Sequence, residues 1–383
     1  MNRRTVRYDS RLDQYHAGRI TRAQPAGDPP DAALSHRLAY LELMDFDRPR
    51  GAPPSPLVWN VCGCTCSCYG MCWIYPKLQT AQWTPWPTIC ALSYQLEKTL
   101  MQIFRYILTI TCPDQVGIVA AVSNALATHN GNIVESSQFS DTESGRFFMR
   151  LVFDLDATIE STLLVDFTPL AQHFRMDWRL YDPHRRPRVM LLVSTVEHCL
   201  NDLLYRHRTG ALPMDITAIV SNHRELAHLA EWHAIPYHYF PVTAANKPEQ
   251  EQQILDLVEQ TDTELVVLAR YMQILSPELC RALTGRAINI HHSFLPGFKG
   301  TKPYHQAYTR GVKLIGATAH FVTANLDDGP IIEQEVERVD HTQTPEQLAA
   351  VGRDIENIVL ARAIHYRLER RVFLNGSKTV VLR

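Results

Sequence analysis

The sequence has no long apolar run and no strong excess of either charge. It contains no stretch of 18 apolar residues, so we expect no membrane-spanning helix. The net charge is −2 and the pI is about 6.8, without the basic excess that is typical of nucleic-acid-binding surfaces. It also lacks a charged start followed by an apolar core, so no secretory signal is expected. We therefore predict a cytoplasmic protein that binds neither membranes nor nucleic acid.

Cysteine is scarce after residue 100, where only Cys112, Cys199 and Cys280 occur. This scarcity is typical of a reduced, cytosolic chain. Three dispersed cysteines of this kind are most simply buried apolar residues. No metal site is expected from them.

Residues 1–100 differ from the rest, because they are rich in proline and follow neither a helical nor a strand period for long. Five cysteines alternate with other residues between Cys62 and Cys72. On a strand their sulfurs would share one face and could hold copper(I) or zinc, but structural zinc usually uses paired Cys-x₂₋₄-Cys units. We expect a disordered or adventitious extension. An alternative is upstream sequence read through a misassigned start, since a well-patterned region begins at Met101.

Residues 101–185 are predicted to form a ferredoxin-like domain with the order βαββαβ. β-rich segments at 104–110, 133–139 and 147–153 and a last strand near 176–182 enclose two helical patterns. Asp114 can cap the first helix. A glycine at position 117 allows close approach of a ligand or of a neighbouring backbone.

The segment Asp114-Gln115-Val116-Gly117-Ile118-Val119, with the "HNGNIVESSQ" that follows the helix, resembles an ACT domain. That resemblance implies packing into a homo-oligomer. It also implies an amino-acid effector, methionine or glycine, bound near Asp114 and Gly117. A purely structural oligomerisation module is the alternative.

Residues 186–383 alternate strand and helix patterns, which predicts an open, mostly parallel, Rossmann-like sheet. The fourth strand pattern, "DTELVVLARYM", is apolar on both faces, as a central parallel strand should be. In such sheets ligands bind beyond the carboxyl ends of the strands. Polar residues gather there, with Arg270 after the fourth strand and Asn289 to Ser293 after the fifth.

The paired histidines of "INIHHSF" are a poor chelating unit, because neighbouring side chains on a strand face opposite sides. Asn289 and His291 share one face instead. An asparagine amide can donate to an oxyanion, and a histidine can hold a proton near neutral pH. A carboxylate such as Asp327, in a loop constrained by Gly329-Pro330, can fix the charge state of that histidine or bind the attacking water. A hydrogen-bonded Asn and His at a strand end is the simpler alternative.

The pattern Asn289-x-His291-x-Ser293-Phe-Leu-Pro, with Leu326-Asp327-Asp328-Gly329-Pro330, resembles the catalytic domain of 10-formyltetrahydrofolate-using enzymes. The resemblance implies that Asn289, His291 and Asp327 are catalytic, although geometry could favour Asp328 over Asp327. Further pocket residues are implied in the same way, namely Arg270, Met272 and Leu275 around the pterin and His320 near the site, where a structural role is equally open.

The segment "VSTVEHCLNDLL" after the first strand has no glycine to cradle the phosphate of an acceptor. Together with the ACT-like domain, this resembles the formyltetrahydrofolate deformylase family. The resemblance implies hydrolysis of 10-formyltetrahydrofolate to tetrahydrofolate and formate, without a permanently bound cofactor. The formate would supply purine biosynthesis and the reaction would balance the one-carbon folate pool. Formyl transfer to glycinamide ribonucleotide and a non-catalytic folate sensor remain alternatives.

Overall fold

The computed structural model describes residues 103–182, 184–297 and 303–383. The predictions for residues 1–100, including the cysteine cluster, lie outside these residues. No helix of the described chain is both long enough and apolar enough to cross a membrane.

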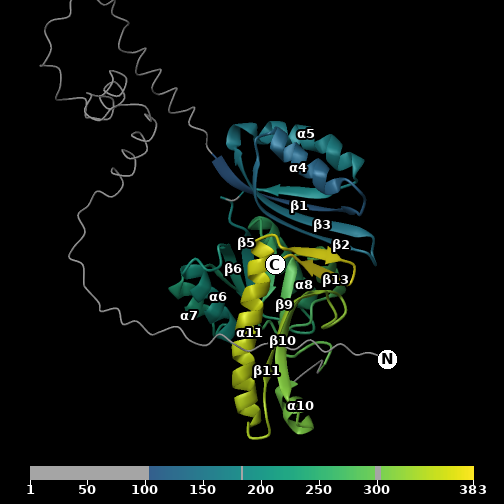
Figure 1. Cartoon of the computed structure of the whole chain (residues 1–383). Coiled ribbons are helices and arrows are strands. Elements are labelled where there is room, and N and C mark those ends of the chain that lie inside the picture. Colours follow the sequence, from purple (N-terminus) through teal and green to yellow (C-terminus); the bar gives the residue numbers. More distant parts are fainter. Residues whose placement is uncertain (1–102, 183, 298–302) are drawn as a thin grey trace, which may run out of the picture. The chain divides into compact units, whose positions relative to one another are not determined.

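The first domain is the predicted βαββαβ unit. Its four strands form an antiparallel sheet in the order β2-β3-β1-β4, and Figure 1 shows both helices on one face of it. In chain order its elements are β1 (Ile103–Pro113), α4 (Ile118–Thr128), β2 (Asn132–Asp141), β3 (Arg146–Asp156), α5 (Glu160–His173) and β4 (Asp177–Tyr181).

Side chains of period two on β1 build the core of this domain. Leu108 and Ile110 are buried against Val122 and Leu126 of α4 and Phe167 of α5. The apolar side chains on one face of the strand pack against the apolar stripe of each helix, so this face of the sheet is buried. The predicted ferredoxin-like arrangement is confirmed.

The second domain has a seven-stranded sheet in the order β11-β10-β9-β8-β5-β6-β7. The strands from β9 to β7 in this order are parallel, whereas β10 and β11 run antiparallel. Its elements are β5 (Arg188–Val193), α6 (His198–Arg208), β6 (Asp215–Ser221), α7 (Ala227–Trp232), β7 (Tyr237–Tyr239), α8 (Lys247–Gln260), β8 (Leu265–Leu268), α9 (Pro277–Ala282), β9 (Ala287–His291), α10 (Pro303–Arg310), β10 (Leu314–Phe321), β11 (Ile331–Arg338), α11 (Pro345–Leu368) and the hairpin β12 (Val372–Asn375) and β13 (Lys378–Val381). The predicted open, mostly parallel sheet is confirmed.

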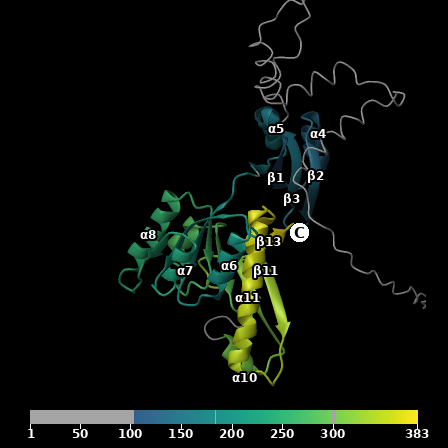
Figure 2. The same ribbon diagram turned by 90° about the vertical axis from the view of Figure 1, so that its left-hand side faces the viewer.

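Helices cover both faces of this sheet. Buried residues of α6, α7 and α11 pack on one face, and those of α8 and α9 pack on the other. The long α11 lies along β10 and β11 (Figure 2) and begins with a capping box between Thr344 and Gln347. Central strands β5 and β8 are therefore buried on both sides, which explains their continuous apolar sequence.

The strand order reverses between β5 and β8, since β5 leads to β6 on one side and β8 leads to β9 on the other. In sheets of this kind ligands bind beyond the carboxyl ends of the strands near such a reversal. The candidate site lies at this edge of the sheet.

Candidate active site

Asn289 and His291 lie on the same face of β9, as strand alternation predicts. Ile288 and Ile290 point to the opposite face and join the apolar core. Asn289 is half-buried and is paired with His320 across the antiparallel β9–β10 ladder. The register of two strands thus brings these side chains together at one end of the sheet.

His291 is oriented by Asp327. Its Nδ1 lies 3.1 Å from Asp327 Oδ1, and the two side chains are 5% and 7% exposed. Burial alone would raise the pKa of Asp327, yet the hydrogen bond from His291 lowers it below its ordinary value. An ionised Asp327 accepts the Nδ1–H of His291. The buried Nε2 of His291 has no hydrogen-bond partner among the described residues and remains available to a ligand.

Gly329 allows the loop that carries Asp327 to pass close to β10. A Cβ at this position would lie 1.7 Å from the carbonyl oxygen of Phe321, so no other residue fits without moving the backbone. The Phe321 N–H also donates to the Pro330 carbonyl at 2.9 Å. Asp327 itself has a left-handed φ of 55°, and Asp328 is exposed. Of the two sequence candidates, the structure places Asp327 against His291.

His320 lies behind Asn289. Its Nδ1 is 2.9 Å from the Phe321 carbonyl, to which only an N–H can donate, so its Nε2 is left to accept. The amide Nδ2 of Asn289 is 3.3 Å from that Nε2. Burial lowers the pKa of His320, which favours this neutral form. His320 therefore orients the Asn289 amide, which is a structural role. Its own side chain also lines the cavity.

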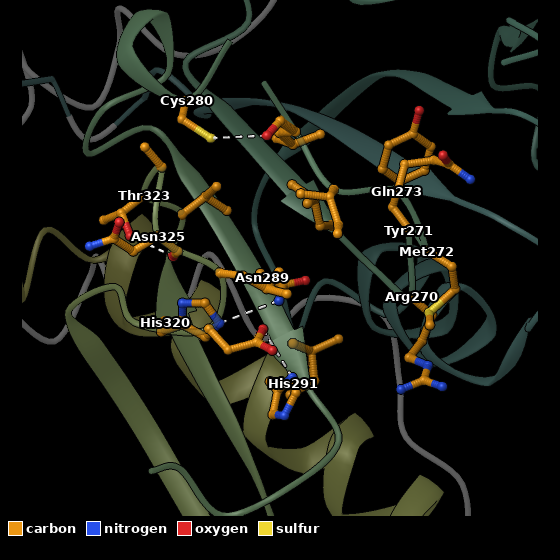
Figure 3. A pocket seen from close by; sticks show the side chains of 18 of the residues that line it. Arg270, Tyr271, Met272, Gln273, Cys280, Asn289, His291, His320, Thr323 and Asn325 are labelled. Carbon is orange, nitrogen blue, oxygen red and sulfur yellow. Dashed lines mark hydrogen bonds and ion pairs between the residues drawn. The ribbon is translucent and has the colours of Figure 1, made fainter. Parts of the chain in front are cut away.

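The cavity that these residues line is shown in Figure 3, with Arg270 across from His320. The loop after β8 forms one wall of it, and residues 322–327 form the opposite wall. Arg270, Met272 and Leu275 all line it. Met272 and Leu326 are 53% exposed at the rim, which provides apolar surface for a flat ring system.

One element differs from its prediction. The fourth strand was expected to run through Met272, but β8 ends at Leu268. Arg270 has a left-handed φ of 67°, which breaks the extended backbone. The Met272 N–H then donates to the Ser194 side chain at 3.0 Å, which attaches this loop to the end of β5. The strand therefore ends because the backbone turns at Arg270, and not because the side chains become polar. The residues that follow form a loop that lines the pocket.

His292 proves to be a neutral neighbour of the site. Burial first, and the charge of Arg270 second, lower its pKa to about 4. Its ring meets that of His291 edge to face at 5.0 Å and lies 6.3 Å from the ring of Tyr304. His292 therefore packs beside the catalytic candidates in its uncharged form.

Sequence reasoning missed Glu356, whose side chain is 1% exposed on α11. It follows Ile355 and precedes Val359 among the buried residues of that helix. An acidic residue among apolar helix positions is visible in the sequence and indicates a buried, paired carboxylate. Within the described chain, His198, Cys199 and Glu356 form one group whose potential ligand atoms lie within 4.8 Å of one another. Both oxygens of Glu356 already accept hydrogen bonds from His198 and Tyr304, and the charge of Arg270 lies beside them.

Comparison with known proteins gives a consistent family for both domains. A model of the formyl transferase family matches residues 187–364, and one of the ACT domain matches residues 106–161. A formyltetrahydrofolate deformylase of Corynebacterium sp. (strain P-1) is 49% identical over 281 residues, which cover 73% of this chain and 98% of the relative. The crystal structure of the deformylase from Burkholderia mallei is 56% identical with a TM-score of 0.71, and covers 73% of this chain and 100% of its own.

A more distant structure, glycinamide ribonucleotide transformylase 1 from Symbiobacterium toebii, is 28% identical with a TM-score of 0.50. It covers 54% of this chain and 98% of its own. The two deformylases thus match about three quarters of this chain, whereas the transformylase matches about half of it. The chain belongs to the formyltetrahydrofolate deformylase family.

Proposed function

We propose that this chain hydrolyses 10-formyltetrahydrofolate to tetrahydrofolate and formate. The observation that carries the proposal is the convergence of Asn289, His291 and Asp327 on one cavity at the carboxyl edge of the sheet. The formate supplies purine biosynthesis, and the reaction returns tetrahydrofolate to the one-carbon pool. We place this activity in the cytoplasm, in a catalytic domain of residues 186–383 that follows an ACT domain of residues 101–185.

In the proposed reaction a water oxygen attacks the formyl carbon and the carbonyl oxygen becomes an oxyanion. Asn289 Nδ2 and the Nε2–H of protonated His291 stabilise that oxyanion. Asp327 accepts the hydrogen bond from His291 Nδ1–H and thereby orients the ring so that its Nε2 can donate. The bond from the formyl carbon to N10 then breaks, N10 takes one proton from the attacking water, and formic acid releases the other as it ionises. These steps use the protein's own proton donors and acceptors, so the proposal requires no permanently bound cofactor.

We propose that the folate ring lies against the loop after β8. Arg270, Met272 and Leu275 line the cavity here, and Met272, which is 53% exposed, offers apolar surface to the flat ring. His320 contributes through Asn289 as described above. With the ring there, the formyl group on N10, outside the ring, can lie at the end of β9.

The proposed activity predicts formate release from 10-formyltetrahydrofolate without any acceptor. Purified protein should release one formate per tetrahydrofolate, measured with a formate dehydrogenase assay, and glycinamide ribonucleotide should not raise the rate. A requirement for the acceptor would instead identify a transferase, and binding without turnover would identify a folate sensor.

We further propose that the ACT domain binds methionine or glycine near Asp114 and Gly117 and that the chain forms a homo-oligomer. Gly117 has a φ of 98°, and no atom of the described residues other than its chain neighbours lies within 4 Å of the position its Cβ would take, so the backbone is open to a ligand. Asp114 accepts a hydrogen bond from Ser140 at the same end of the sheet. Val116 is fully exposed and Val134 is 48% exposed, which is apolar surface that a second copy would cover.

Methionine or glycine is expected to change the rate of formate release in the natural chain, and Gly117→Ala should weaken that response because alanine is strained at this φ. Rates are measured against effector concentration. Gly210→Ala, at an equally open glycine with a φ of 77° in the other domain, is the control. An unchanged response in Gly117→Ala would place the effector elsewhere. If the natural chain shows no response, the ACT domain would serve only as a structural oligomerisation module.

A further inference from the structure

Beside the catalytic candidates lies a buried charged cluster built around Glu356. Its Oε2 accepts from His198 Nε2 at 2.9 Å, and its Oε1 accepts from the Tyr304 hydroxyl at 2.7 Å. Arg270 Nη1 lies 3.5 Å from the same Oε2. Burial would raise the pKa of Glu356, but these partners lower it below its ordinary value, so the carboxylate is charged.

The backbone is adapted to this cluster. Gly352 lies one turn before Glu356 on α11, and a Cβ there would lie 2.1 Å from the Tyr304 ring. Only glycine lets Tyr304 pack against the helix so that its hydroxyl reaches the carboxylate. Arg270 reaches it from a left-handed backbone position with a side chain that is 13% exposed. Four segments far apart in the sequence therefore meet at one carboxylate.

The cluster borders the reaction centre. Arg270 lines the same cavity as Asn289, His291 and Asp327, and its charge lowers the pKa of His292, which lies beside His291. The Nε of Arg270 is buried and has no hydrogen-bond partner among the described residues. A guanidinium is always protonated, so this wall of the cavity carries a fixed positive charge.

This charge has a consequence for the acceptor of the formyl group. A primary amine acceptor is largely an ammonium ion at neutral pH, and a buried ammonium needs a carboxylate partner. Asp327, which lines the cavity, is engaged by His291, and Glu356 is engaged by Arg270, His198 and Tyr304, so neither carboxylate is left to pair with an ammonium. Water is small and neutral, so it needs no carboxylate partner and is not repelled by the positive charge of Arg270.

We propose that Arg270 restricts the formyl acceptor to water. Its guanidinium is already paired with Glu356, the carboxylate that a cationic amine would need as its partner. Glu356 is the positioning residue that holds Arg270 in place. The inference rests on the deformylase activity proposed above. It also accounts for how a chain with the fold of a glycinamide ribonucleotide transformylase can release formate instead.

The test measures how the formyl group is divided between water and glycinamide, a small cationic amine. Transfer forms a bond from the formyl carbon to the amine nitrogen and breaks the bond to N10, which takes one of the two protons lost by the ammonium, while solvent takes the other. Formate and N-formylglycinamide are quantified by chromatography after complete consumption of 10-formyltetrahydrofolate. The natural chain should give formate with no more than a trace of N-formylglycinamide, and glycinamide should not inhibit formate release.

Arg270→Gly removes the charge at a φ that glycine adopts freely, and Arg270→Asn does so with a residue that tolerates the left-handed region. Both should raise the share of N-formylglycinamide by about tenfold or more, since a like-charge contact is removed. Arg270→Lys keeps the positive charge and should keep the product ratio of the natural chain, whatever its effect on the rate. Arg270→Gly with Glu356→Gln should lose the gain, because no carboxylate remains to hold the ammonium.

Competitive inhibition of the natural chain by glycinamide would overturn the proposal without any variant. So would an unchanged product ratio in folded Arg270→Gly and Arg270→Asn, or an equal gain in the double variant. If the neutral variants fold but do not turn over, glycinamide binding is measured by saturation-transfer NMR, and no increase over the natural chain also overturns it. Absence of formate release from the natural chain would instead contradict the deformylase activity itself.

Discussion

Asn289→Ala is expected to lower kcat for formate release by about a hundredfold or more, with KM little changed, because an oxyanion donor acts mainly in the transition state. The amide of Asn289 is held against His320 Nε2 at 3.3 Å, so its direction is fixed before substrate binds. Such preorganisation is what gives one donor a large effect. Steady-state kinetics on 10-formyltetrahydrofolate measure the loss, and circular dichroism checks the fold.

Asn201→Ala is the matched control, since it removes the same amide from an exposed position on α6 and should leave kcat unchanged. An Asn289→Ala variant with near-natural kcat would show that the oxyanion is stabilised by other groups. A rise in KM alone would assign Asn289 to substrate binding instead.

Asp327→Asn is expected to lower kcat by about a hundredfold or more, on the scale of a lost acid–base partner. The variant keeps the size of the side chain but removes the negative charge that lies 3.1 Å from His291 Nδ1. Without that charge the hydrogen bond from His291 Nδ1 loses its ionised acceptor, and the ring can adopt the other tautomer. Asp328→Asn is the control, because it removes a carboxylate from the next, exposed residue. Equal losses in the two variants would contradict the assignment of Asp327.

The same pair predicts how stability depends on pH. The pKa of Asp327 in the folded protein lies below its ordinary value of 3.8, so the folded state binds its proton less readily than the unfolded state. The stabilisation is therefore complete at pH values above 3.8 and is lost as the pH falls through the folded value. The difference in free energy of unfolding between the natural chain and Asp327→Asn should shrink on acidification below pH 3.8. A difference that grows there would reverse the proposed ionisation.

Local patterns in the sequence determined the element types and one half of the site. Alternation along "AINIH" was enough to put Asn289 and His291 on one face, because side chains of a strand alternate whatever surrounds them. The order of strand and helix patterns determined both architectures, since each pattern must bury its apolar face. The comparisons with known proteins agree with the family that the two motifs indicated.

The tertiary structure decided the contacts between distant segments. Asp327, not Asp328, pairs with His291 because the loop backbone turns left-handed where Gly329 passes Phe321. The end of β8 at Leu268 also depends on backbone dihedrals that side-chain polarity does not encode.

The cluster at Glu356 draws on α6, the loop after β8, and α10, and no pattern along the chain connects them. Ion pairs of this kind depend on where loops return in space, so only the folded chain shows that Arg270 already neutralises the buried carboxylate beside the reaction centre.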